Sequence, residues 1–205
     1  MVLKQLRILY LHGFKSSPSS LKAQQTMQYF AQLDLAQNLH IPHLPPEPSL
    51  AIEQAMFLYE QLIDEVGIAN VFIIGSSLGG YYASYLIERF GGRGALINPA
   101  VKPYELLVNY LGENENYHTG EKFVVTKAYM ADLKAIEVKH LKQPKQHLLL
   151  VQMSDETLDA HEATAKYRNG PSIIECGGNH SYVDFPKRLN TIMNFALADS
   201  KNNKT

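Results

Sequence analysis

Three residue types that can jointly make a serine hydroxyl reactive stand far apart in this chain. Ser77 lies in the pentad GSSLG at 75–79, Asp155 lies beyond an apolar run, and His180 follows two glycines. A serine hydroxyl is a weak nucleophile, so it needs a base such as histidine to accept its proton and a carboxylate to orient that base. With both partners, the chemistry would be attack on a carbonyl carbon and acyl transfer.

The pentad has the Gly-x-Ser-x-Gly spacing of a nucleophile elbow. An apolar, mostly β-branched or aromatic run at 71–74 precedes it, and a helical pattern at 81–90 follows it. A strand, this pentad and a helix form the setting in which a sharp turn presents a serine at the carboxyl end of a sheet. Side chains at Gly75 or Gly79 would crowd the strand and the helix where they nearly touch. The alternative is an ordinary Gly/Ser turn, so the interpretation depends on partners elsewhere.

The candidate acid and base follow later strands. Asp155 comes soon after the apolar run 148–151, which predicts a place at the same sheet edge as Ser77. Asp159 is the alternative acid, and either carboxylate could instead cap a helix. His180 follows the last expected strand, and the serine, acid, base order is that of one large class of hydrolases. The alternative for His180 is a loop imidazole bonded to backbone groups.

Acyl transfer also needs N–H donors for the oxyanion that develops on the carbonyl. The expected donors are the backbone N–H groups of Leu78, next to the serine, and of Phe14, in the loop after the first strand. His12 is expected to brace that loop. His40 and His43 form the only close histidine pair, and without a nearby cysteine or acidic cluster they do not indicate a metal site. Dinucleotide-binding and P-loop motifs are absent, and no cofactor is expected.

The expected elements alternate along the chain. Strands are expected at 8–11, 38–41, 71–74, 95–97, 147–151 and 171–176, and helices at 21–33, 50–66 (capped by Ser49), 81–90 and 185–197. Strands separated by helices predict an α/β fold of three layers, with about six mainly parallel strands and helices on both faces. One domain, 1–205, is expected.

The interval 101–145 interrupts this alternation and carries helical pieces of its own, at 104–111 and 130–136. It predicts a small cap-like insertion over the carboxyl edge of the sheet, where ligands bind in such folds. The polar end of the chain, 199–205, is expected to be a frayed tail.

Composition narrows the class of protein. The net charge of −1 gives no electrostatic reason to expect nucleic acid as a partner. No apolar run approaches the length of a membrane span, and no signal-peptide pattern opens the sequence. The single cysteine, Cys176, cannot form an intrachain disulfide, which suits a reducing compartment. A cytoplasmic location is therefore expected, while the oligomeric state stays open.

Taken together, these residues resemble the α/β hydrolase superfamily and, more closely, the small bacterial esterases of the YqiA/YcfP type. The stretches that carry the resemblance are LYLHGF at 9–14, SSP at 16–18, PP at 45–46, GSSLGGYY at 75–82, NPAV at 98–101, YLGENEN at 110–116 and GGNH at 177–180.

The resemblance implies a serine esterase that acts on small-molecule acyl esters or thioesters, including acyl-CoA. It also implies that Ser77 is the nucleophile, Asp155 the acid and His180 the base, with no diffusible cofactor. Ser154 stands directly before Asp155, where the family pattern has glycine, so Asp159 stays open as the acid. The alternative function is a non-catalytic hydrolase fold kept for binding or scaffolding.

Overall fold

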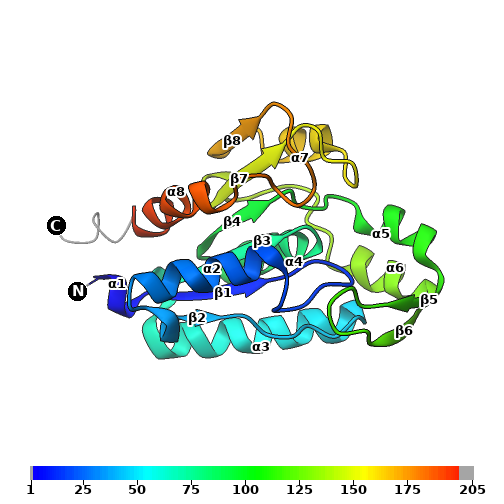
Figure 1. Cartoon of the computed structure of the whole chain (residues 1–205), viewed down its shortest axis with the longest axis horizontal. Coiled ribbons are helices and arrows are strands. Elements are labelled where there is room, and N and C mark those ends of the chain that lie inside the picture. The colour runs from blue at the N-terminus through cyan, green and yellow to red at the C-terminus, as the bar shows by residue number, and fades with distance from the viewer. Residues whose placement is uncertain (1, 199–205) are drawn as a thin grey trace.

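A parallel six-stranded sheet forms the centre of the computed structural model, which describes residues 2–198 (Figure 1). The strand order is β2-β1-β3-β4-β7-β8. The strands are β1 (Arg7–Leu11), β2 (Leu39–His40), β3 (Val71–Ser76), β4 (Arg93–Ile97), β7 (His147–Gln152) and β8 (Ser172–Glu175). This architecture confirms the fold class that the alternating pattern predicts. The tail expected at 199–205 lies outside the described residues.

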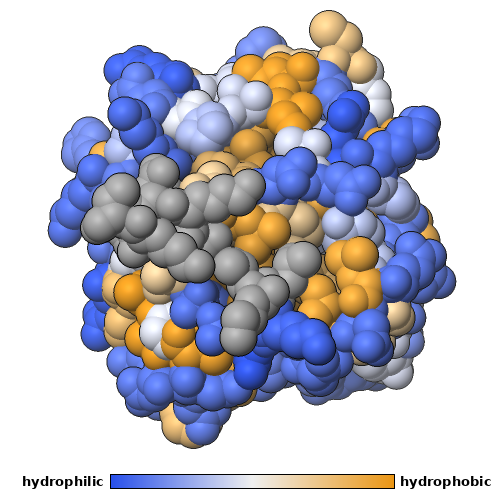
Figure 2. Space-filling model, turned by 90° about the vertical axis from the view of Figure 1, so that its left-hand side faces the viewer, coloured by the Kyte–Doolittle hydropathy of each residue, from blue (hydrophilic) through white to orange (hydrophobic). Residues whose placement is uncertain are grey.

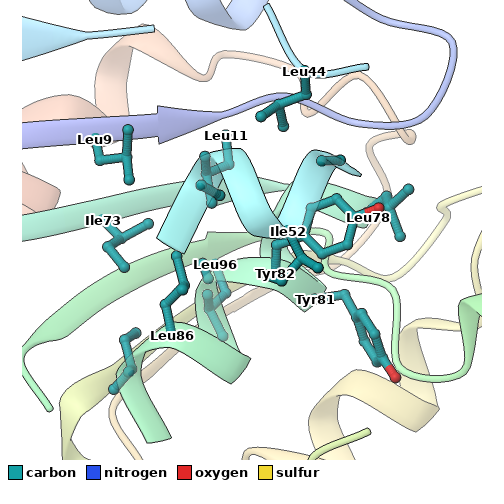
Figure 3. Close-up of a cluster of buried hydrophobic side chains, with 14 of the residues drawn as sticks. Leu9, Leu11, Leu44, Ile52, Ile73, Leu78, Tyr81, Tyr82, Leu86 and Leu96 are labelled. Atoms are coloured by element: carbon teal, nitrogen blue, oxygen red, sulfur yellow. The ribbon is translucent and has the colours of Figure 1, made fainter. Parts of the chain in front are cut away.

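Helices cover both faces of the sheet. They are α2 (Leu21–Gln32), α3 (Pro48–Val66), α4 (Leu78–Phe90), α7 (Ala160–Lys166) and α8 (Pro186–Leu197). Successive side chains in a strand point to opposite faces. Leu9 and Leu11 therefore belong to one buried cluster with residues of α3, α4 and α7, whereas Ile8 and Tyr10 belong to another with residues of α2 and α8. Figure 3 shows part of the first cluster, to which β1 contributes Leu9 and Leu11 and α4 contributes Leu86.

The segment between β4 and β7 holds a separate group of elements. They are α5 (Pro103–Leu106), η3 (Leu107–Tyr110), β5 (Gly112–Glu115), β6 (Lys122–Val125) and α6 (Lys127–Ala135). Figure 1 shows them gathered at the end of the sheet that is opposite the N-terminus. The ring of Phe14 meets the rings of Tyr110 and Phe123 edge-on, at centroid distances of 5.4 and 5.8 Å. The segment thus packs against the loop that follows β1.

Several local elements differ from the sequence expectations. The antiparallel β5–β6 hairpin was not expected, because the polar run at 112–115 lacks the apolar alternation of a half-buried strand. α7 was not expected either, because seven residues are too few to show a helical period. α3 begins at Pro48 with Glu47 as its N-cap, so the expected cap at Ser49 is wrong; proline suits the first turn, where its missing N–H costs nothing. Four further short helices are α1 (Val2–Gln5), η1 (Ala36–Asn38), η2 (Ile68–Asn70) and η4 (Pro144–Gln146).

Figure 2 shows one face of the molecule, on which charged and polar residues surround several apolar areas. Scattered apolar residues on a surface are ordinary. Cys176 is a free, exposed thiol. Within residues 2–198, no helix has both the length and the apolar character needed to cross a bilayer.

Candidate active site

Ser77 occupies the sharp turn where β3 ends and α4 begins. Its backbone has φ 55° and ψ −121°, in a region that non-glycine residues rarely adopt and that often marks functional sites. Four hydrogen bonds hold the backbone of Ser77. The Ser77 N–H donates to the Ile97 carbonyl (3.0 Å), and the Ser77 carbonyl accepts from the N–H groups of Gly80 (2.9 Å), Ala100 (3.1 Å) and Tyr81 (3.4 Å). The surrounding chain therefore maintains the strained conformation.

Glycines let three chain segments meet at this turn. A Cβ at Gly75 would collide with the backbone of Gly79, and a Cβ at Gly79 would collide with the carbonyl of Leu11 in β1. A Cβ at Gly13 would lie 3.1 Å from the Cβ of Ser77. The close approach of these segments therefore requires glycine at 75 and 79, as the Gly-x-Ser-x-Gly spacing predicts.

The structure brings Ser77, His180 and Asp155 together, although they are separated by many residues along the chain. The Oγ of Ser77 lies 3.1 Å from the Nε2 of His180, and the Nδ1 of His180 lies 2.8 Å from the Oδ2 of Asp155. The Asp155 side chain is 1% exposed and that of His180 is 22% exposed. A carboxylate on Nδ1 favours the tautomer with its proton there, which leaves Nε2 free to accept a proton from the serine.

The two candidate acids have different roles in the structure. The second oxygen of Asp155, Oδ1, accepts hydrogen bonds from the N–H groups of Thr157 (2.8 Å) and Leu158 (2.9 Å). Burial alone would raise the pKa of Asp155, but the hydrogen bonds from His180 and from these N–H groups outweigh it and hold the pKa below its ordinary value. Asp159 instead accepts from the N–H of His161 (2.8 Å) and caps α7. Contact with the imidazole therefore singles out Asp155.

Two polar side chains that the sequence pattern did not mark as functional hold the loop around His180. The Nδ2 of Asn98 donates to the carbonyls of Asn179 (3.0 Å) and His180 (3.2 Å). The Oε1 of Gln152 accepts from the N–H groups of Asn179 (3.1 Å) and Val183 (2.8 Å). Asn98 follows β4 and Gln152 ends β7, so the strand-end rule that identified Asp155 would also have found them.

A lysine and a second carboxylate complete this support. The Nζ of Lys22 donates to the carbonyls of His180 and Ser181, both at 3.2 Å, and the Oε2 of Glu156 accepts from the N–H of His180 at 3.0 Å. Burial lowers the pKa of Lys22 to about 8, although the carboxylates of Asp155 and Glu156 act in the opposite direction. Nothing in the sequence around Lys22 indicated this contact, because α2 meets the His180 loop only in the folded chain.

The expected oxyanion donors lie beside the serine. Phe14 and Leu78 line one cavity together with Ser77 and His180. Among the described residues, no protein acceptor takes a hydrogen bond from the backbone N–H of Phe14 or Leu78. Leu78 is the first residue of α4, where an N–H has no intrahelical partner and the helix dipole favours negative charge.

His12 braces the loop that carries Phe14, as the sequence predicts. Its Nδ1 lies 3.0 Å from the Gly13 carbonyl, and its Nε2 accepts from the N–H of Leu44 at 3.1 Å. One ring nitrogen therefore donates while the other accepts, which requires a neutral imidazole. Burial lowers the pKa of His12 to about 4, in keeping with that neutral form.

Two cavities of different character open at the serine. The first, called here the apolar cavity, has a volume of about 160 Å³ and is lined mainly by apolar side chains, among them Leu106, Leu107 and Tyr110. The second, called here the polar cavity for its hydroxyl, imidazole and ammonium groups, has a volume of about 300 Å³. These groups belong to Ser16, Ser20, Lys22, Ser76, His118 and Ser181, and they share the lining with apolar surfaces of Tyr10, Phe14, Leu21 and Tyr117. Phe14, Ser77, Tyr117 and His180 line both cavities.

His40 and His43, the histidine pair considered above as metal ligands, lie beside other groups in the structure. The Nε2 of His43 lies 3.4 Å from the Oε2 of Glu121. Burial lowers the pKa of His40. Within the described part of the chain, the structure contains no group of three or more His, Cys, Asp or Glu residues that could hold a metal ion.

Solved esterases share this fold. The chain is similar to Est1E from Butyrivibrio proteoclasticus, with a TM-score of 0.68 and 14% identity over 97% of this chain and 90% of Est1E. It is also similar to the esterase domain of a Rhodothermus marinus protein (TM-score 0.60, 15% identity, 96% and 86% covered). An esterase of Pyrococcus furiosus is similar as well (TM-score 0.61, 12% identity, 95% and 82% covered). These likenesses establish the α/β hydrolase fold.

A sequence model of the family described as "Uncharacterised protein family (UPF0227)" matches residues 7–197. The match runs from the first residue of β1 to the last residue of α8 and includes Ser77, Asp155 and His180. The chain therefore belongs to UPF0227, the YqiA/YcfP family that its motifs resemble.

Proposed function

We propose that this protein is a serine hydrolase that cleaves carboxylic esters or acyl thioesters, with Ser77 as nucleophile. The observation that carries the proposal is the hydrogen-bonded series from Asp155 through His180 to Ser77, with distances of 2.8 and 3.1 Å. Esterases among the structural relatives support the hydrolytic class. The family resemblance favours acyl esters and thioesters, acyl-CoA among them, as substrates.

The proposed reaction begins with proton transfer. His180 Nε2 accepts the proton of Ser77 as Oγ attacks the substrate carbonyl. The Asp155 carboxylate stabilises the resulting imidazolium, while the N–H groups of Phe14 and Leu78 stabilise the oxyanion. The imidazolium then protonates the leaving alkoxide or thiolate, and an acyl-enzyme remains.

Water completes the cycle. With the leaving group gone, His180 accepts a proton from a water molecule, which attacks the acyl-enzyme carbonyl. The second oxyanion is stabilised by the same N–H groups, and its collapse returns the proton to Ser77 and releases the carboxylic acid. Each step uses only side chains, backbone N–H groups and water, so the proposed reaction needs no cofactor.

A serine-directed label and one substitution test the proposal. Purified wild-type protein is expected to react covalently with a fluorophosphonate at Ser77 and to hydrolyse p-nitrophenyl acetate. Ser77→Ala is expected to do neither while keeping the wild-type circular dichroism spectrum. Ser19→Ala, at an exposed serine, serves as the matched control and is expected to behave as wild type.

Two outcomes would contradict the proposal. Unchanged turnover by correctly folded Ser77→Ala would remove Ser77 as nucleophile. A folded wild-type protein that neither takes the label nor cleaves any ester or acyl-CoA would favour the non-catalytic binding or scaffold function.

A further inference from the structure

We propose that the apolar cavity beside Ser77 is the acyl-binding pocket and that it admits a compact apolar acyl group, of up to about six carbon atoms or one aromatic ring. The inference rests on the proposed hydrolase function. It adds which of the two cavities receives the acyl part of the substrate and how large that part is.

The walls of the apolar cavity come from separate stretches of the chain. Phe14 belongs to the loop after β1, Leu106 and Leu107 belong to α5 and η3, and Leu158 follows β7. The ring of Phe14 packs edge-on against Tyr110, so the two aromatic walls fix each other. Leu107 is 3% exposed and belongs to the main core cluster. These walls therefore belong to the packed structure, although the exposed side chain of Tyr117 also lines the cavity.

The proposed oxyanion donors connect this cavity to the reaction. Leu78, which supplies one of the two backbone N–H groups, lines the apolar cavity and not the polar one, whereas Phe14, which supplies the other, lines both. A carbonyl oxygen bound by these groups belongs to a carbonyl carbon beside the Oγ of Ser77. The acyl chain attached to that carbon then begins at the cavity that Leu78 lines.

The polar cavity suits an acyl chain less well. Apolar surfaces such as those of Phe14 and Leu21 line part of it, but a chain placed there would also cover hydroxyl groups such as that of Ser181 and the ammonium group of Lys22, which would lose hydration without gaining hydrogen bonds. The alcohol or thiol part of a substrate can replace those contacts with water. The two cavities therefore divide an ester into an apolar acyl half and a more polar leaving half.

The volume of the apolar cavity sets the size of the acyl group. Its volume of about 160 Å³ is close to the roughly 150 Å³ of an engineered apolar cavity that binds benzene. Each methylene buried in it should raise kcat/KM about fourfold, the equivalent of about 0.8 kcal/mol. Once the cavity is full, further methylenes lie in water and add nothing.

A series of p-nitrophenyl esters with lengthening acyl chains tests this inference. For the wild type, kcat/KM is expected to rise by about fourfold per methylene from acetate through butyrate towards hexanoate, and to stop rising between hexanoate and dodecanoate. Leu106→Trp, which fills the cavity, is expected to lower kcat/KM for hexanoate at least about tenfold more than kcat/KM for acetate.

Two further variants complete the design. Val108→Trp places the same large side chain at a position of η3 that is 51% exposed, and is expected to leave the whole series unchanged. Leu106→Ala enlarges the cavity and is expected to extend the rise to octanoate. The two Leu106 variants are expected to shift the preferred acyl-chain length in opposite directions. If one of them fails to fold, the other still tests the inference.

The outcomes separate this inference from the proposed function, because fluorophosphonate labelling of Ser77 does not depend on acyl length. Labelled wild type whose kcat/KM keeps rising through dodecanoate, or does not rise beyond acetate, would overturn the acyl-pocket assignment alone. Labelled Leu106→Trp that loses acetate and hexanoate activity equally would do the same. Absence of both labelling and ester cleavage would overturn the proposed function itself.

Discussion

Asp155→Asn is the substitution whose effect the structure defines most sharply. Both carboxylate oxygens of Asp155 are engaged: Oδ2 lies 2.8 Å from the Nδ1 of His180, and Oδ1 accepts from the N–H groups of Thr157 and Leu158. An amide has one oxygen and one NH₂ group. Since only the oxygen can accept from the two N–H groups, the NH₂ group of the variant must face His180.

This arrangement reverses the tautomer of His180. An NH₂ group next to Nδ1 requires Nδ1 to accept, so the ring proton moves to Nε2 and points at Ser77. The imidazole then cannot accept the serine proton. The equivalent substitution in a chymotrypsin-type protease lowers kcat about 10⁴-fold with the geometry intact, which corresponds to about 5 kcal/mol. We expect a loss of kcat of that order with little change in KM, because the cavities are untouched.

The assay is steady-state hydrolysis of p-nitrophenyl acetate, with circular dichroism to confirm folding. Asp159→Asn is the matched control: Asp159 caps α7, and asparagine caps a helix about as well as aspartate, so its kcat should stay within about twofold of wild type. If Asp155→Asn kept kcat within about tenfold of wild type, or if Asp159→Asn lost more activity, the assignment of the acid and the tautomer reasoning would both be wrong.

Two predictions concern stability. The pKa of His12 is about 4 in the folded protein and near 6.5 in the unfolded chain, so the unfolded state binds more protons as the pH falls from 7 to 5, and this group should remove about 2 kcal/mol of stability over that range. Urea unfolding at pH 7 and pH 5 should show that His12→Asn loses less free energy of unfolding than the wild type does. An equal loss in both proteins would contradict this prediction. Gln152→Leu leaves the partly buried N–H groups of Asn179 and Val183 without their acceptor, which should cost about 1–3 kcal/mol, and an unchanged urea midpoint would refute this.

Much of the fold and of the candidate site could be predicted from short apolar runs and from the residues directly after each run. The carboxyl ends of parallel strands lie at one edge of a sheet, so residues just beyond 71–74, 148–151 and 171–176 were expected to meet there. Ser77, Asp155 and His180 do meet there. The prediction succeeded because strand direction, not detailed packing, decides which edge a loop joins.

Details that depend on turn dihedrals or on contacts distant in sequence could not be predicted. Asp155 and Asp159 both follow β7, and which of them faces His180 depends on how the loop turns. Lys22 reaches the carbonyl of His180 across 158 positions of the chain, and no local pattern carries that information. The β5–β6 hairpin pairs a polar run with a partner only four residues long, so neither strand has the apolar period that reveals strands elsewhere.

The position of segment 101–145 in the strand order has a consequence for how relatives of this protein can diverge. β4 and β7 are adjacent strands, with Gly94 opposite His147, so they can pair whatever segment connects them in sequence. Ser77, Asp155 and His180 lie outside that excursion, whereas Leu106 and Leu107 lie within it. Mutation, lengthening or replacement of this segment can therefore change which molecules the apolar cavity accepts, while the proposed catalytic residues stay the same.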